Sequence, residues 1–129
     1  MSKIEAVLFD LDGTLLDSFP DFLASLENIN INSPSKKIDE SIVRANVSDG
    51  SSKLLKLVFN IDADDEGFDE HKRNFLNEYE KNIVMYGNLF HVVSDLLNFL
   101  LDKKIPYGIV TNKPRKYTEI ILKKSSLLR

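Results

Sequence analysis

Two aspartates, Asp10 and Asp12, follow an apolar run and are the residues in this chain best placed to do chemistry. The run covers Ile4–Phe9, and its nearly continuous apolar character predicts a strand that is buried on both faces of a parallel sheet. Residues two apart on an extended backbone project to the same side, so both carboxylates should leave the strand together. Ligands of open α/β sheets bind outside the carboxyl ends of their strands, which makes this a predicted ligand site.

The residues around the two carboxylates indicate a metal and a phosphate. Neighbouring carboxylates repel each other and need a cation or a shared proton. Mg²⁺ fits because it prefers oxygen ligands and also binds phosphate, with Asp10 and Asp12 as the expected metal ligands. Gly13 permits a tight turn, and Thr14 with the free amides of that turn can face an anion. A calcium loop or a solvated turn is the alternative, but Leu15 stands where a calcium loop would continue its oxygen ligands.

The rest of the chain predicts the elements that must position this site. Helical spacing of apolar residues predicts an all-helical middle, with Asp21 near the positive end of its first helix. An apolar helix, a second strand at 105–110 and a helix opened by Pro114 follow. The expected helices of the middle cover 19–29, 38–45, 54–58 and 68–83, with a break at 32–35. A right-handed crossover would set the two strands parallel and side by side, as in an α/β fold.

Composition excludes several classes of function. The chain has no cysteine, which excludes disulfides, thiolate metal sites and a cysteine nucleophile. Its net charge of −3 is spread along the chain, so neither a nucleic-acid partner nor a membrane surface is expected. The first apolar run is interrupted too early for a signal peptide, and a cytoplasmic protein is the default expectation.

Two motifs resemble one known family. The segment Phe9–Leu15 (FDLDGTL) matches the first motif of the haloacid-dehalogenase superfamily, and Thr111–Pro114 (TNKP) is similar to the second motif of its phosphoglycolate phosphatase branch. The resemblance covers essentially the whole chain. It implies a Rossmann-like α/β core, residues 1–16 and 83–129, with an all-helical cap, residues 17–82, inserted after the first strand.

The resemblance also implies a phosphatase mechanism that acts on a small phosphorylated metabolite. Asp10 would attack phosphorus and form an aspartyl phosphate, while Asp12 would act as general acid and then as general base. Thr111 and Asn112 would bind phosphate oxygens, although both also suit a helix cap. Lys113 is expected to be solvated.

Substrate choice is less well defined. Arg44 and Gly50 resemble the cap segment that approaches the substrate, with phosphoglycolate as the best single expectation. Ser48 stands where this branch usually has glycine, which puts the substrate in doubt. A phosphomutase shares the first motif and stays open as an alternative. A phosphoryl-receiver domain is disfavoured because it lacks the DxDGT pattern and the helical insert.

The sequence departs from the family in one large respect. The family's later lysine and acidic motifs are expected after the second strand, and neither precedes Arg129. Two like charges about 4 Å apart cost about 4 kcal/mol at an effective dielectric of about 20, so loss of the lysine predicts a roughly thousandfold lower rate. The alternative to an enzyme is therefore a truncated, non-catalytic relative. Such a chain would self-associate, or bind a complementing chain, through its incomplete sheet.

Overall fold

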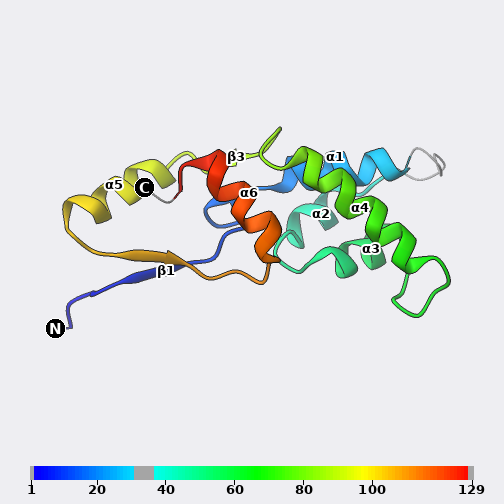
Figure 1. Cartoon of the computed structure of the whole chain (residues 1–129), viewed down its shortest axis with the longest axis horizontal. Coiled ribbons are helices and arrows are strands. Elements are labelled where there is room, and N and C mark those ends of the chain that lie inside the picture. The colour runs from blue at the N-terminus through cyan, green and yellow to red at the C-terminus, as the bar shows by residue number, and fades with distance from the viewer. Residues whose placement is uncertain (1, 31–36, 128–129) are drawn as a thin grey trace.

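The structure is a computed structural model that describes residues 2–30 and 37–127 (Figure 1). The break predicted at 32–35 lies outside the described residues. The elements in chain order are β1 (Val7–Phe9), β2 (Leu16–Asp17), α1 (Phe19–Asn30), α2 (Glu40–Ala45), α3 (Ser51–Phe59), α4 (Phe68–Asn82), β3 (Asn88–Leu89), α5 (Val93–Asp102), β4 (Tyr107–Ile109) and α6 (Arg115–Ser125).

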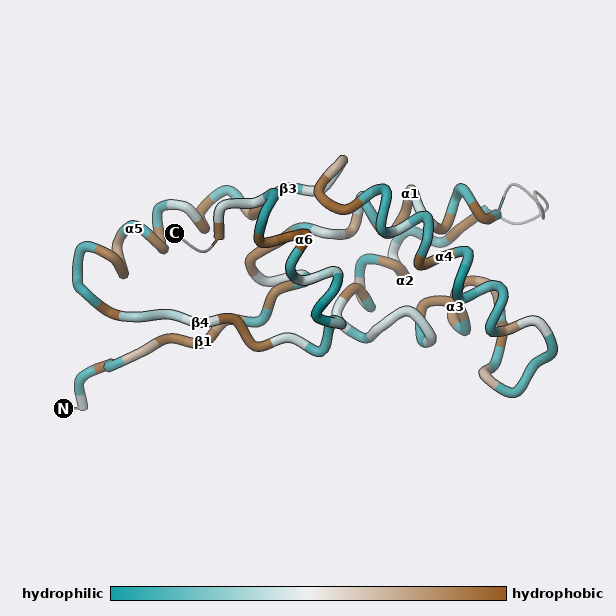
Figure 2. The backbone as a smooth tube through the Cα atoms, in the orientation of Figure 1, coloured by the Kyte–Doolittle hydropathy of each residue, from teal (hydrophilic) through white to brown (hydrophobic). Residues whose placement is uncertain are grey.

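Strands β1 and β4 form a parallel pair, which confirms the predicted pairing of the two apolar runs. Phe9 faces Ile109 in the register, and both side chains contact the apolar core. Leu8 faces Gly108 and is 71% exposed, so the expected burial of this strand on both faces is wrong. In the described part of the chain this sheet has two strands, β1 and β4, which run side by side (Figure 2). The exposed side chain of Leu8 shows that the face that carries it is left open.

A second, antiparallel pair was not predicted. Leu16 of β2 faces Leu89 of β3, and Asp17 faces Asn88. Each strand has two residues, which is too short for the alternation of apolar and polar residues that marks a strand in a sequence. This pair places the chain that enters the helical middle beside the chain that leaves it (Figure 1).

The middle of the chain is helical, as predicted. Helix α1 packs mainly against α4, while α2 and α3 complete the group (Figure 1). Phe22 of α1 stacks on Tyr79 of α4 with ring centroids 4.6 Å apart, and Phe75 continues the stack. The division into a core, residues 1–16 and 83–129, and a cap, residues 17–82, stays a prediction. None of the described helices is both long and apolar enough to cross a bilayer.

Asp21 joins the helical middle to the segment that follows it. Its carboxylate is 1% exposed and accepts hydrogen bonds from the backbone amides of Val84 (2.9 Å), Tyr86 (2.9 Å) and Gly87 (3.0 Å). A side chain at Gly87 would place its Cβ 2.4 Å from the Asp17 carbonyl oxygen. The close approach of the two segments therefore requires both glycine at position 87 and an acceptor at position 21.

Replacing Asp21 with asparagine should destabilise the chain by about 3 kcal/mol, because one acceptor oxygen becomes an amide that faces backbone donors. Urea unfolding followed by circular dichroism measures the change. Asp69→Asn is the matched control, since Asp69 is an exposed carboxylate in the first turn of α4, and its expected effect is within about 0.5 kcal/mol. Equal effects of the two substitutions would contradict the role assigned to Asp21.

Candidate active site

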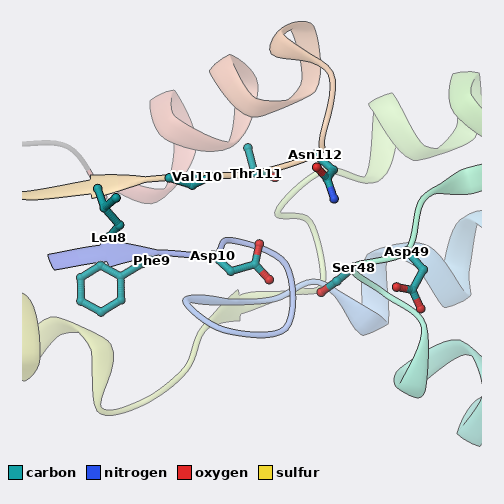
Figure 3. A pocket seen from close by; sticks show the side chains of 8 residues that line it. All are labelled: Leu8, Phe9, Asp10, Ser48, Asp49, Val110, Thr111 and Asn112. Carbon is teal, nitrogen blue, oxygen red and sulfur yellow. The ribbon is translucent and has the colours of Figure 1, made fainter.

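A cavity of about 410 Å³ opens at the carboxyl ends of β1 and β4 (Figure 3). Three segments line it. The first is residues 8–10, at the end of β1. The second is Ser48 and Asp49, between α2 and α3, and the third is residues 110–112, directly after β4. The cavity therefore lies where the end of a parallel sheet meets the helical middle, which is the place that the sequence predicted for a ligand.

Asp10 reaches the cavity because β1 ends directly before it. The amide of Val110 donates to the carbonyl of Phe9 at 2.8 Å, which holds the two strand ends together. Asp10 is exposed, and its carboxylate points toward the space between the strand ends and the segment that carries Ser48 (Figure 3). Asn112 reaches the same space from the other strand.

Asp12 is placed differently from the prediction. The chain turns back after Asp10, because the carbonyl of Leu11 accepts from the amides of Leu15 and Leu16, both at 3.0 Å. Asp12 is 6% exposed and does not line the cavity. Its Oδ2 lies 3.2 Å from Nζ of Lys113, and its Oδ1 is buried without a hydrogen-bond partner in the described structure. The expectation that both carboxylates face one open cavity therefore holds for Asp10 alone.

Lys113 is a residue of the candidate site whose placement the sequence did not predict. The expected solvated lysine is wrong, because its side chain is only 7% exposed. Nζ donates to the hydroxyl of Tyr79 at 2.6 Å and lies 4.9 Å above the Phe22 ring. The signal available in the sequence was its position directly after Asn112, at the end of a predicted strand.

Burial acts in opposite directions on the two charged groups of this pair. It raises the pKa of the Asp12 carboxyl, and the Lys113 ammonium opposes that rise. It lowers the pKa of Lys113, and the Asp12 carboxylate opposes that fall. The hydroxyl of Ser18 is also buried, and like Lys113 it opposes the rise in the pKa of Asp12. The Asp10 carboxylate adds slightly to that rise.

The segment between α2 and α3 contacts the turn that carries Asp12. The hydroxyl of Ser48 donates to the Asp12 carbonyl at 2.6 Å. Gly13 has a φ of +79°, and a Cβ there would lie 3.0 Å from Cγ2 of Val47. Glycine is therefore required at position 13 both for the backbone conformation and for this contact.

The other predicted site residues do not line the cavity. Thr14 and Gly50 are exposed, and neither they nor Gly13 line the cavity. The Arg44 guanidinium lies 4.1 Å from the centre of the Phe19 ring and 3.5 Å from the Asp17 carboxylate. The expectation of free amides in the turn is wrong, because the Gly13 amide donates to the Leu16 carbonyl at 2.8 Å and the Thr14 amide donates to the Leu11 carbonyl at 3.2 Å. The roles of the Thr14 hydroxyl, Arg44 and Gly50 stay predictions.

Thr111 lines the cavity and also supports its own loop, because its Oγ1 accepts from the Lys113 amide at 3.1 Å. This bond lies in the loop before α6 and is not the helix cap expected as the alternative, because the N-cap of α6 is Pro114 and no side chain caps it. The Thr111 O–H remains a donor for a phosphate oxygen.

A metal ion would find few protein ligands here. Among the described residues, no three side chains of aspartate, glutamate or histidine are grouped to hold a metal. The Asp10 carboxylate and the Asp12 carbonyl remain, and the carbonyl keeps one lone pair beside its bond from Ser48. Two oxygen ligands suit Mg²⁺, which usually keeps several waters and shares substrate phosphate oxygens. The Asp12 carboxylate is the poorer ligand because Lys113 occupies Oδ2.

Comparison with known proteins places the chain in a family. The model of the haloacid dehalogenase-like hydrolases matches residues 7–129. The N-acetylmuramic acid 6-phosphate phosphatase of Pseudomonas putida is 31% identical over 97% of this chain and 56% of that relative. The phosphoglycolate phosphatase of Xanthomonas campestris pv. campestris is 38% identical over 91% of this chain and 52% of the relative.

A solved structure agrees with the sequence comparisons. The crystal structure of a predicted phosphoglycolate phosphatase from Haemophilus somnus 129pt superposes with a TM-score of 0.81 at 26% identity, over 98% of this chain and 60% of that one. The chain thus spans about half the length of the curated relatives it matches. The predicted α/β fold with an incomplete Rossmann-like core is confirmed, and the chain belongs to the haloacid dehalogenase-like hydrolase family.

Proposed function

We propose that this chain carries the nucleophile of a phosphatase that hydrolyses a small phosphorylated metabolite. One observation carries the proposal. An exposed carboxylate, Asp10, stands at the carboxyl end of a strand and borders a cavity that Thr111 and Asn112 also line. A nucleophile and phosphate-binding groups on neighbouring strand ends are the arrangement that transfer of a phosphoryl group requires.

The proposed reaction has two steps. In the first, Asp10 attacks phosphorus, the bond to the leaving oxygen breaks, and Asp12 gives that oxygen a proton. In the second, water attacks the aspartyl phosphate, Asp12 takes a proton from the water, and phosphate is released with Asp10 regenerated. Thr111 and Asn112, with the hydroxyl of Thr14, are the groups proposed to bind the phosphate oxygens. The Gly13 amide is left out of this set, because it donates to the Leu16 carbonyl at 2.8 Å.

Mg²⁺ is the proposed cofactor. The Asp10 carboxylate and the Asp12 carbonyl would hold it, as the chemistry of these oxygens allows. When bound, it would neutralise charge on the phosphate beside Asp10. Removal of divalent ions should therefore remove activity.

Phosphoglycolate is the proposed substrate because relatives of this name match over nearly the whole chain. The relative named for N-acetylmuramic acid 6-phosphate supports a second candidate of the same class. A cavity of about 410 Å³ suits a metabolite of this size. Ser48 and Asp49 face it from the helical middle and are proposed to contact the part of the substrate beyond the phosphate.

Asp10→Asn should reduce magnesium-dependent phosphate release to the background rate, because an amide is a poor nucleophile toward phosphorus. Release of inorganic phosphate from phosphoglycolate and from N-acetylmuramic acid 6-phosphate, with and without a chelator, measures this. The control is Asp95→Asn, an exposed carboxylate in the first turn of α5, which should keep the activity of the unchanged chain. An Asp10→Asn chain with undiminished turnover would show that the mechanism is wrong.

A second candidate function is a binding role for the open sheet face. Leu8 and Val110 are 71% and 60% exposed on β1 and directly after β4, and neither contacts the apolar core. Exposed apolar side chains beside unpaired strand edges favour addition of another polypeptide. In this function the open sheet face would bind a second copy of the chain or a complementing chain, and the chain would not be catalytic.

Sedimentation velocity separates the two functions. If the sheet face is a binding surface, the unchanged chain should self-associate, and Leu8→Lys combined with Val110→Lys should return it to a monomer. Leu57→Lys, on α3, is the matched control for an exposed leucine outside the sheet and should leave association unchanged. A monomeric chain that hydrolyses phosphate esters would contradict the binding role as self-association.

A further inference from the structure

Lys113 is a buried cation that the proposed reaction does not yet use. Its Nζ lies 3.2 Å from Oδ2 of Asp12, donates to the Tyr79 hydroxyl at 2.6 Å, and sits 4.3 Å from the centre of the Tyr79 ring. The Phe22 ring covers it at 4.9 Å. An ammonium group surrounded in this way has exchanged most of its water for one carboxylate, one hydroxyl and two ring faces.

The groups around Lys113 come from parts of the chain that are far apart. Asp12 belongs to the turn after β1, and Lys113 to the loop after β4, whereas Phe22 and Tyr79 belong to helices α1 and α4. The two rings are stacked nearly parallel, with an interplanar angle of 12°. Lys113 therefore links the stacked rings of the helical middle to the Asp12 carboxylate at the end of the sheet.

The contact also leaves the two oxygens of Asp12 unequal. Oδ2 accepts the Lys113 ammonium, while Oδ1 is buried and has no hydrogen-bond partner in the described structure. A proton on this carboxyl group belongs on Oδ1, because Oδ2 can then still accept a hydrogen bond from the Lys113 ammonium.

We propose that Lys113 is a positioning residue that fixes Asp12 through Oδ2. This inference rests on the proposed function, in which Oδ1 then gives its proton to the leaving oxygen. Tyr79 and Phe22 hold Lys113 in place, so the arrangement of α1 against α4 sets the position of the acid. The step balances: the leaving oxygen gains the Oδ1 proton as its bond to phosphorus breaks and the Asp10 bond forms.

Leaving-group dependence tests this role. A proton is needed when an alkyl oxygen leaves, as from phosphoglycolate, but hardly when p-nitrophenolate leaves from its phosphate ester. Lys113→Met should therefore lower kcat for phosphoglycolate by about tenfold or more relative to kcat for p-nitrophenyl phosphate. Lys113→Arg should restore part of the ratio. Tyr79→Phe, which removes only the hydroxyl, should lower the ratio less.

Lys116→Met is the matched control. Lys116 also pairs with α4, through Glu80 at 3.0 Å, but its side chain is exposed and lies outside the Asp12 contact. It should leave the ratio of the two kcat values unchanged. A Lys113→Met chain that loses both activities equally would reduce Lys113 to a structural residue and overturn the proposal.

A spectroscopic measurement keeps the inference separate from the proposed function. If the chain hydrolyses neither ester, or Asp10→Asn is fully active, the proposed function fails. The ¹³C resonance of the Asp12 carboxyl, assigned with Asp12→Asn, then decides on positioning. It should move in Lys113→Met and in Tyr79→Phe, but not in Lys116→Met or in Tyr117→Phe, whose ring packs on Tyr79. An Asp12 resonance unmoved by the first two substitutions would overturn the inference.

Discussion

Phe9 and Ile109 face each other in parallel strands, and the backbone bond from Val110 to Phe9 closes the pair at 2.8 Å. The approach of Asp10 to Thr111 and Asn112 depends on this pairing. It brings the segment after β1 and the segment after β4 to one edge, although they are about a hundred residues apart in the chain. A shift of one residue in the register would turn Asp10 away from Asn112, because side chains alternate along a strand.

Two buried carboxylates connect the helical middle to the segments around it, by different means. Asp21 accepts hydrogen bonds from three backbone amides, whose positions are fixed by the chain and which always act as donors. Asp12 is held by one buried lysine, which contacts Oδ2 and leaves Oδ1 buried without a hydrogen-bond partner in the described structure. The first arrangement suits a rigid joint between the helical middle and the strands. The second suits a group that must exchange a proton, because Oδ1 lies outside the contact with Lys113.

Local sequence was sufficient to predict the two parallel strands, the helical middle and the place of Asp10. Each follows from apolar spacing or from a strand that ends in charged residues. The β2–β3 pair escaped because its strands have two residues each. The predicted helix-end role of Asp21 missed its main partners, which lie more than sixty residues further along the chain.

The candidate site shows the same limit. Asp12 was expected in the open cavity, but its burial depends on Lys113 and on the turn at Leu11, and no local pattern shows how a turn tilts one carboxylate inward. Lys113 looked solvated because its cover, Phe22 and Tyr79, lies on helices that only the tertiary fold brings together. The open face at Leu8 likewise follows from which strands pair, not from how apolar the strand is.

The most direct test of the account is whether a phosphoryl group is found on Asp10 during turnover. The chain is mixed with phosphoglycolate and Mg²⁺, quenched in acid, digested and analysed by mass spectrometry. The account predicts a phosphorylated peptide that contains Asp10 and disappears in Asp10→Asn. Turnover with the phosphoryl group on another residue, or with no covalent adduct at any quench time, would contradict it.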